Sequence, residues 1–280
     1  MKLKVFYNDN QTAKTNDSYS PSATKPAEVL KSWQNLGLPL EVISDFSPVT
    51  IDQLCKAHER EYVEGVMNLT QNNGFSNRLP EIRDSLLWTS GSFMAAAIHA
   101  IETGAPCASL TSGFHHANYN NGGGYCTFNG LMATAIHLKE SRLANKIGIL
   151  DLDAHYGDGT DDIIEKLDID YIEHYTFGEH RIIPENSDDW IKTLESIVEK
   201  FEGCDVLLYQ AGADPHIDDP LGGSLTSEQM RERDRIVFEV CKALNIPVVW
   251  NLAGGYQTPL RKVLDIHDAT AQECLAVYGE

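Results

Sequence analysis

The segment that most constrains how this chain can fold is residues 147–160, IGILDLDAHYGDGT, where an apolar stretch runs directly into acidic and histidine side chains. Ile147, Ile149 and Leu150 carry no charge, and such a run is typical of a strand covered on both faces of a parallel sheet. Polar groups that follow such a strand lie at the carboxyl edge of the sheet, where α/β folds bind their ligands. The segment therefore predicts an α/β fold with a functional site at the end of this strand.

The polar part of this segment has the spacing of a site. Asp151, Asp153 and His155 are two residues apart, so in extended backbone their side chains leave from the same side. Thr160 is expected to cap a helix over residues 161–167. A solvated acidic loop that happens to contain a histidine is the simpler alternative, but the concentration of functional groups directly after an apolar strand favours a site.

The rest of the chain alternates between strand and helix patterns. Further strands are expected at residues 3–7, 40–43, 107–110, 169–172, 206–209 and 248–252. Helices are expected at residues 26–34, from 51, at 83–103, 190–201 and 226–244, and beyond 259. Residues 72–80 are polar and are expected to form an exposed loop. This alternation predicts a single α/β domain over residues 1–280, with a mostly parallel sheet and helices on both faces.

Composition limits which partners the protein can bind and in which compartment it is expected. The net charge of −19, without a run of Lys or Arg, disfavours a nucleic-acid or anionic-membrane surface. The sequence has no apolar stretch long enough to span a bilayer and no signal-peptide pattern at its start. Its six cysteines form no CxxC pair, which is typical of reduced thiols. We therefore expect a cytoplasmic protein.

Three more segments place polar side chains directly after predicted strands. His115 and His116 follow the strand at 107–110, Asp214 follows the strand at 206–209, and Tyr256 follows the strand at 248–252. Parallel strands bring their carboxyl ends to one edge, so these side chains should converge on one crevice.

The convergent side chains include a set of metal-ligand type. Asp153, His155 and Asp214 offer two carboxylates and an imidazole, which is the number of protein ligands that leaves one position open in a catalytic zinc site. These donors alone do not distinguish Zn²⁺ from Fe²⁺ or Co²⁺. An ion of this kind makes water a nucleophile near neutral pH and polarises a carbonyl.

The remaining polar groups suit acid–base chemistry. His115 and His116 titrate in the right range for a general base, and each would need a carboxylate to orient its ring. Asp151 and Asp158 are the acids left over for that purpose. Tyr256 follows two glycines and could hydrogen-bond a developing oxyanion. Taken alone, a histidine pair is usually structural and a Gly-Gly-Tyr is usually a turn.

The glycine run at residues 122–124 lacks the spacing and the Lys-Ser/Thr of a P-loop. We interpret it as backbone that approaches a substrate, with Tyr125 as one wall of a slot.

Taken together, these segments resemble the zinc-dependent histone deacetylase family, including its bacterial histone deacetylase-like and acetylpolyamine amidohydrolase members. The resemblance covers roughly residues 55–260 and rests on ordered motifs. They are GFHHA at 113–117, GYCTFN at 124–129, DLDAHYGDGT at 151–160, QAGAD at 210–214, DPLG at 219–222 and GGY at 254–256. The resemblance implies an arginase-like deacetylase fold.

The resemblance also implies cofactors. It makes Asp153, His155 and Asp214 the ligands of one zinc ion. It further implies that Asp151 helps to bind a structural potassium ion.

For catalysis, the resemblance makes His116 the general base and acid and His115 its electrostatic neighbour. Asp151 would orient His115, and Asp158 would orient His116. Tyr256 would polarise the amide carbonyl and hold the tetrahedral oxyanion.

Substrate contacts follow from the same resemblance. Gly124 and Tyr125 would line an acyl-lysine tunnel, and Leu221 would lie at its rim. Polyamine-selective relatives carry a glutamate at that rim position, so Leu221 favours acyl-lysine. The chain departs from the family at residues 20–24, SPSAT, where a His-Pro-Glu-Arg signature is usual.

The resulting hypothesis is a zinc-dependent amidohydrolase that removes an acetyl or another short acyl group from lysine by metal-activated water, in a bacterial cytoplasm. Two alternatives stay open. The first is a deacetylase of acetylpolyamines or other small acetylated amines. The second is a catalytically silent protein that binds acyl-lysine.

Overall fold

The computed structural model describes residues 1–15 and 17–279, and its strands form one sheet. The strands are β1 (Leu3–Phe6), β2 (Leu40–Ile43), β3 (Cys107–Ser109), β4 (Ile147–Asp151), β5 (Ile172–Thr176), β6 (Val206–Gln210) and β7 (Val248–Asn251). Their order across the sheet is β2-β1-β3-β7-β6-β4-β5, and each neighbouring pair is parallel. This confirms the predicted α/β fold with a parallel sheet.

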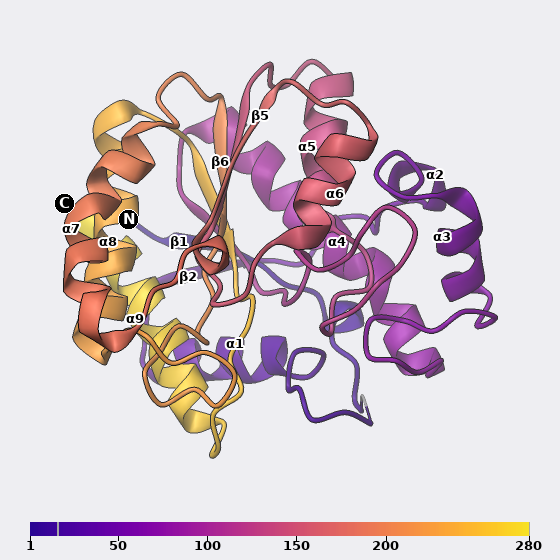
Figure 1. The fold of residues 1–280 in the computed structure, drawn as a ribbon, viewed down its shortest axis with the longest axis horizontal. Helices are drawn as coiled ribbons and strands as arrows, with labels where there is room; N and C mark the ends of the chain where they lie inside the picture. Colours follow the sequence, from indigo (N-terminus) through magenta and orange to yellow (C-terminus); the bar gives the residue numbers. More distant parts are fainter. Residues whose placement is uncertain (16, 280) are drawn as a thin grey trace.

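Helices cover both faces of the sheet, as Figure 1 shows. One face packs against α1 (Lys25–Asn35), α7 (Ser187–Glu199), α8 (Ser227–Leu244) and α9 (Arg261–Tyr278). The other packs against α2 (Ile51–Leu54), α3 (Arg60–Met67), α4 (Pro80–Thr103), α5 (Gly130–Glu140) and α6 (Asp158–Lys166). Short 3-10 turns lie at Asp9–Gln11, Phe177–Glu179 and Pro184–Asn186. No helix in the described part of the chain is long and apolar enough to cross a membrane.

Local sequence signals account for several helix ends. The Thr50 hydroxyl accepts from the Gln53 backbone at the start of α2, and Thr226 does the same for Gln229 at the start of α8. Gly104 ends α4 with a φ of 68°, a conformation that costs glycine little because it has no Cβ. All five residues of β4 and of β6 are buried, as the apolar runs at 147–150 and 206–209 predict.

The strand predicted at residues 169–172 is displaced. The chain leaves α6 through Asp168, which has a φ of 51°, and β5 begins only at Ile172, which pairs with Ile147. As an edge strand, β5 is only half-buried and contains Glu173 and His174, so hydrophobicity does not mark it.

Helix α5 was not expected from the sequence. Its residues are almost all buried, so it lacks the polar face whose period identifies a surface helix. The Asn129 side chain caps it by accepting from the Met132 backbone N–H at 3.1 Å.

The expected start of α6 was also wrong. The helix begins at Asp158 after Gly157, and Thr160 lies in its first turn instead of capping it. The Thr160 hydroxyl is buried and accepts from the Asn129 side-chain amide at 3.1 Å. Thr160 therefore joins α6 to the start of α5.

The loop at residues 72–80 is not simply exposed. Asn73 and Gly74 are buried, and Gly74 bonds both the Thr127 hydroxyl and the Tyr125 backbone N–H. Phe75 packs against the Tyr125 ring at 5.7 Å between centroids. This loop supports the segment that carries Tyr125.

Candidate active site

Three side chains of metal-ligand type converge at the carboxyl edge of the sheet. Asp153 and His155 follow β4, and Asp214 follows β6. One ligand atom from each lies within 4.8 Å of the others. His155 Nδ1 lies 3.0 Å from Asp153 Oδ1 and 2.9 Å from Asp214 Oδ2. The structure thus brings together the three residues that the sequence analysis grouped as ligands.

A bend, and not an extended strand, creates this convergence. Strand β4 ends at Asp151, whose carboxylate accepts from the Asp153 backbone N–H at 3.1 Å. Asp153 in turn accepts from the His155 backbone at 3.0 Å, and Asp214 accepts from the Ala154 backbone at 3.2 Å. The backbone is not extended beyond Asp151, so the shared side that extended backbone would give these residues does not apply, and carboxylate-to-backbone bonds set the geometry.

The cluster concentrates buried negative charge. Asp153 and Asp214 are buried, and burial together with the charge of Asp153 raises the pKa of Asp214. Burial acts to raise the pKa of Asp153 too, but the neighbouring His115 and His155 outweigh it and hold that pKa well below its usual range. Bonds to the two carboxylates raise the pKa of His155 to about 11.

This donor set fits a divalent cation. Two buried carboxylates are stabilised by a positive charge placed between them, and two oxygens with one imidazole nitrogen suit zinc. The backbone at Gly254 also fits a bound cation, because a Cβ there would come within 2.3 Å of Asp214 Oδ2 and 2.7 Å of Asp153 Oδ2. Glycine at this position keeps the space beside the ligand atoms open.

The two adjacent histidines each have their own carboxylate. His115 Nδ1 donates to Asp151 Oδ2 at 2.7 Å, and His116 Nδ1 donates to Asp158 Oδ1 at 2.6 Å. Their ring centroids are 4.1 Å apart. The side chain of His115 is only 4% exposed, whereas that of His116 is 23% exposed. His116 is therefore the histidine that an incoming molecule can reach.

The two histidine–carboxylate pairs also differ in their electrostatic surroundings. Burial acts to lower the pKa of His115, but Asp151 and Asp153 outweigh it and raise that pKa to about 9. Burial acts to raise the pKa of Asp158, but its bond to His116 outweighs burial and lowers it. His115 thus lies in the more negative surroundings.

Tyr256 faces the cluster from the loop after β7. Its side chain is buried, and its ring lies 6.4 Å from the His155 ring between centroids. Asp219 fixes the loop by accepting from the Tyr256 backbone at 2.8 Å, and Asp153 accepts from the Gly254 backbone at 2.8 Å. Burial and the charges of Asp153 and Asp214 raise the pKa of the Tyr256 phenol, which keeps it a hydrogen-bond donor.

The residues predicted to contact substrate lie next to His116, Tyr256 and Asp219. Gly124 has a φ of 53°, and a Cβ there would lie 2.4 Å from His116 Cδ2, so only glycine leaves room for that ring. The Tyr125 ring lies 5.7 Å from the Tyr256 ring. Leu221 is 44% exposed, and its backbone donates to Asp219.

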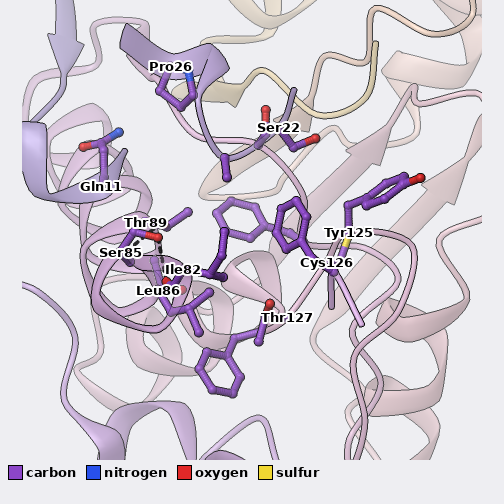
Figure 2. A pocket seen from close by; sticks show the side chains of 16 residues that line it. Gln11, Ser22, Pro26, Ile82, Ser85, Leu86, Thr89, Tyr125, Cys126 and Thr127 are labelled. Carbon is purple, nitrogen blue, oxygen red and sulfur yellow. Dashed lines mark hydrogen bonds between the residues drawn. The ribbon is translucent and has the colours of Figure 1, made fainter. Parts of the chain in front are cut away.

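A small cavity of about 40 Å³ lies beside Tyr125, Cys126 and Phe114. Figure 2 shows Tyr125 at its edge, with Ile82 and Leu86 across the cavity. None of the three ligand-type residues lines it, and its volume has room for about three water molecules. It is therefore a side cavity and not the path to the ligand-type cluster.

Sequence reasoning missed two residues of this site. Tyr19 stacks nearly parallel on Tyr256, with ring centroids 6.4 Å apart. Lys25 is fully buried, and its ammonium donates to the carbonyls of Ala253 at 2.6 Å and Gly254 at 3.0 Å. Burial lowers the pKa of Lys25 to about 8. Both residues lie near the amino terminus, and only the fold brings them beside the loop of Tyr256.

Solved structures share this fold along the whole chain. The HDA15 HD domain superposes with a TM-score of 0.80 at 16% identity, covering 100% of this chain and 90% of that one. An acetylpolyamine aminohydrolase from Burkholderia pseudomallei superposes with a TM-score of 0.77 at 14% identity, covering 99% of each chain. At this identity the likeness establishes the fold class, an α/β fold of the deacetylase and amidohydrolase type.

Sequence comparison then gives the family. The profile of the histone deacetylase domain matches residues 21–188 and 183–271, so the chain belongs to the histone deacetylase family. This confirms the resemblance found in the motifs.

Individual relatives are distant. An uncharacterised protein of Picosynechococcus sp. is 28% identical over 219 residues, which cover 70% of this chain and 71% of that protein. Histone deacetylase 2 of Arabidopsis thaliana is 30% identical over 196 residues, 62% of this chain. That match spans only 50% of the plant protein. Family membership supports a hydrolase of the deacetylase or amidohydrolase type.

Proposed function

We propose that this chain is a zinc-dependent amidohydrolase that removes an acetyl or another short acyl group from the side chain of lysine. The observation that carries the proposal is the arrangement of two histidine–carboxylate pairs beside the Asp153, His155 and Asp214 cluster. Metal-ligand and acid–base groups that meet in this way suit hydrolysis of an unactivated amide.

His116 is the proposed general base and acid. Its Nδ1 is held by Asp158, so Nε2 is the atom that takes a proton from the attacking water and returns it to the departing amine nitrogen. Asp158 keeps the ring in place and stabilises its protonated form. His115, held by Asp151 and buried beside His116, places a second imidazole against the His116 ring.

Tyr256 is the proposed oxyanion donor. Its phenol stays protonated and faces the cluster, so it can donate to the carbonyl oxygen as negative charge develops there. Gly124 and Tyr125 form the wall past which the acyl-lysine enters, and Leu221 lies at the rim.

Asp153, His155 and Asp214 are the proposed zinc ligands. A zinc ion bound there would polarise the amide carbonyl and make water a better nucleophile near neutral pH. Asp151 is a proposed ligand of a separate structural potassium ion. The cytoplasm is the proposed compartment, which the free cysteines of the described chain support because a reducing environment keeps thiols unpaired.

A small acetylated amine is the second candidate substrate. The net charge of −19 would attract a cationic polyamine, and the Burkholderia pseudomallei protein of similar fold is an acetylpolyamine aminohydrolase. The apolar Leu221 at the rim offers such a cation no partner, which favours acyl-lysine.

The test is amine release by metal-stripped protein before and after one equivalent of Zn²⁺, with an acetyl-lysine peptide and N-acetylputrescine as parallel substrates. We expect zinc-dependent release from the peptide at a higher kcat/KM than from N-acetylputrescine. An Asp214→Asn variant serves as the control, because it removes a proposed ligand and should stay inactive with zinc.

The other outcomes separate the alternatives. A higher kcat/KM for N-acetylputrescine would show that small acetylated amines are the preferred substrates and would leave the proposed reaction unchanged. Zinc-dependent binding of the peptide without product would identify a silent acyl-lysine-binding protein and reject the enzyme.

A further inference from the structure

A buried arginine on α8 contacts two of the loops that build the site. Arg233 is fully buried, and its Nη1 donates to the carbonyl of Leu152 at 3.1 Å and to that of Gly212 at 2.8 Å. Leu152 immediately precedes Asp153, and Gly212 lies two residues before Asp214. One guanidinium group therefore holds both segments that carry the two carboxylates of the cluster.

The guanidinium is itself held in place. Arg233 Nε donates to Asp234 Oδ1 at 2.8 Å, and Nη2 lies 2.8 Å from the same oxygen. Asp234 also accepts from the hydroxyl of Tyr209 and from that of Thr270, the latter at 2.5 Å. Because Tyr209 belongs to β6 and Thr270 to α9, this network anchors Arg233 to the sheet and to a neighbouring helix. The guanidinium group of Arg233 cannot turn away from the two loops without breaking these bonds.

We propose that Arg233 is a positioning residue for the metal centre: it fixes the spacing between Asp153 and Asp214 by tying their loops to one rigid guanidinium. This inference rests on the proposed function, since it takes those carboxylates as metal ligands. Arg233 acts through the backbone carbonyls of the two loops, to which its guanidinium donates.

Geometry explains why the tether matters. The loops also meet directly, because a Cβ on Gly212 would lie 2.6 Å from Asp153 Cα. The Ala154 backbone donates to Asp214 across the same contact. A metal ion needs its ligands at fixed distances, and partners that orient ligands typically contribute 10–100-fold to metal affinity. Lysine keeps the charge at this position, but it lacks the planar fork that can serve Asp234 and two carbonyls together.

The experiment is a Co²⁺ titration of metal-stripped protein, followed by visible absorbance of the bound ion, for wild type, Arg233→Lys, Arg233→Met and Val237→Ala. We expect the Arg233 variants to bind Co²⁺ 10–100-fold more weakly and to change its absorption spectrum. Val237 is a buried core residue on the same helix, and its alkyl side chain cannot donate a hydrogen bond to either carbonyl. Its variant should lose stability in urea and keep wild-type Co²⁺ affinity.

Each outcome decides the inference. Wild-type affinity and spectrum in folded Arg233→Lys would overturn it, as would an equal loss of affinity in Val237→Ala, which would trace the effect to general stability. If Arg233→Met does not fold, Arg233→Lys alone decides. Wild-type protein without Co²⁺ binding would overturn the metal centre and the inference with it. Binding without hydrolysis of any acyl substrate would reject the proposed activity and leave the role of Arg233 intact.

Discussion

Replacing Gly124 by alanine tests whether the position of the His116 ring controls turnover. The new Cβ would lie 2.4 Å from His116 Cδ2 and 2.9 Å from Cγ, whereas carbon atoms in contact are about 3.5 Å apart. The ring must therefore move by about 1 Å, and a misplacement of that size in a reacting group can lower the rate about 100-fold. The φ of 53° at this position should also cost alanine about 1–2 kcal/mol of stability.

The assay compares kcat/KM for an acetyl-lysine peptide with Co²⁺ affinity in Gly124→Ala and Gly123→Ala. The adjacent Gly123 is a matched control, because a Cβ there meets no atom within 4 Å. We expect Gly124→Ala to lose about 100-fold in kcat/KM while Co²⁺ affinity stays unchanged, because none of the three proposed ligands is touched. Wild-type kcat/KM in folded Gly124→Ala would refute the placement of His116 as the base.

Three further predictions concern other parts of the chain. Tyr256→Phe should lower kcat by about 10²–10³ without weakening Co²⁺ binding, since it removes one oxyanion donor; unchanged turnover would contradict that role. Tyr19→Ala should raise KM for the peptide by about 2–10-fold with kcat maintained, because it removes an exposed aromatic surface stacked on Tyr256; an equal KM would place Tyr19 outside the substrate path. Burial lowers the pKa of His58 to about 4 from 6.5, so between these pH values the folded state binds fewer protons than the unfolded state. Unfolding then takes up a proton, and the free energy of unfolding should fall by about 3 kcal/mol as the pH drops through this window. In urea titrations, the free energy of unfolding of His58→Gln should not show this fall. The same pH dependence in His58→Gln and wild type would contradict the role of His58.

The sequence by itself determined the class of fold and the family. Apolar runs such as residues 147–150 of β4 and 206–209 of β6 must be covered on both faces, and parallel strands require helical crossovers, so the pattern leaves few other folds. Because the carboxyl ends of those strands meet at one edge, His115, Asp153 and Asp214 could be grouped without coordinates.

Tertiary structure alone decided which groups touch and how the loops are held. The half-buried β5 and the almost entirely buried α5 escaped prediction, since hydrophobic periodicity marks only elements with one covered face. Lys25 on α1 donates to backbone carbonyls of one loop, and Arg233 on α8 donates to those of two loops. Because every residue has a backbone carbonyl, the sequence does not reveal which carbonyls a buried lysine or arginine will bind. The packing of the helices against the sheet decides which carbonyls these are.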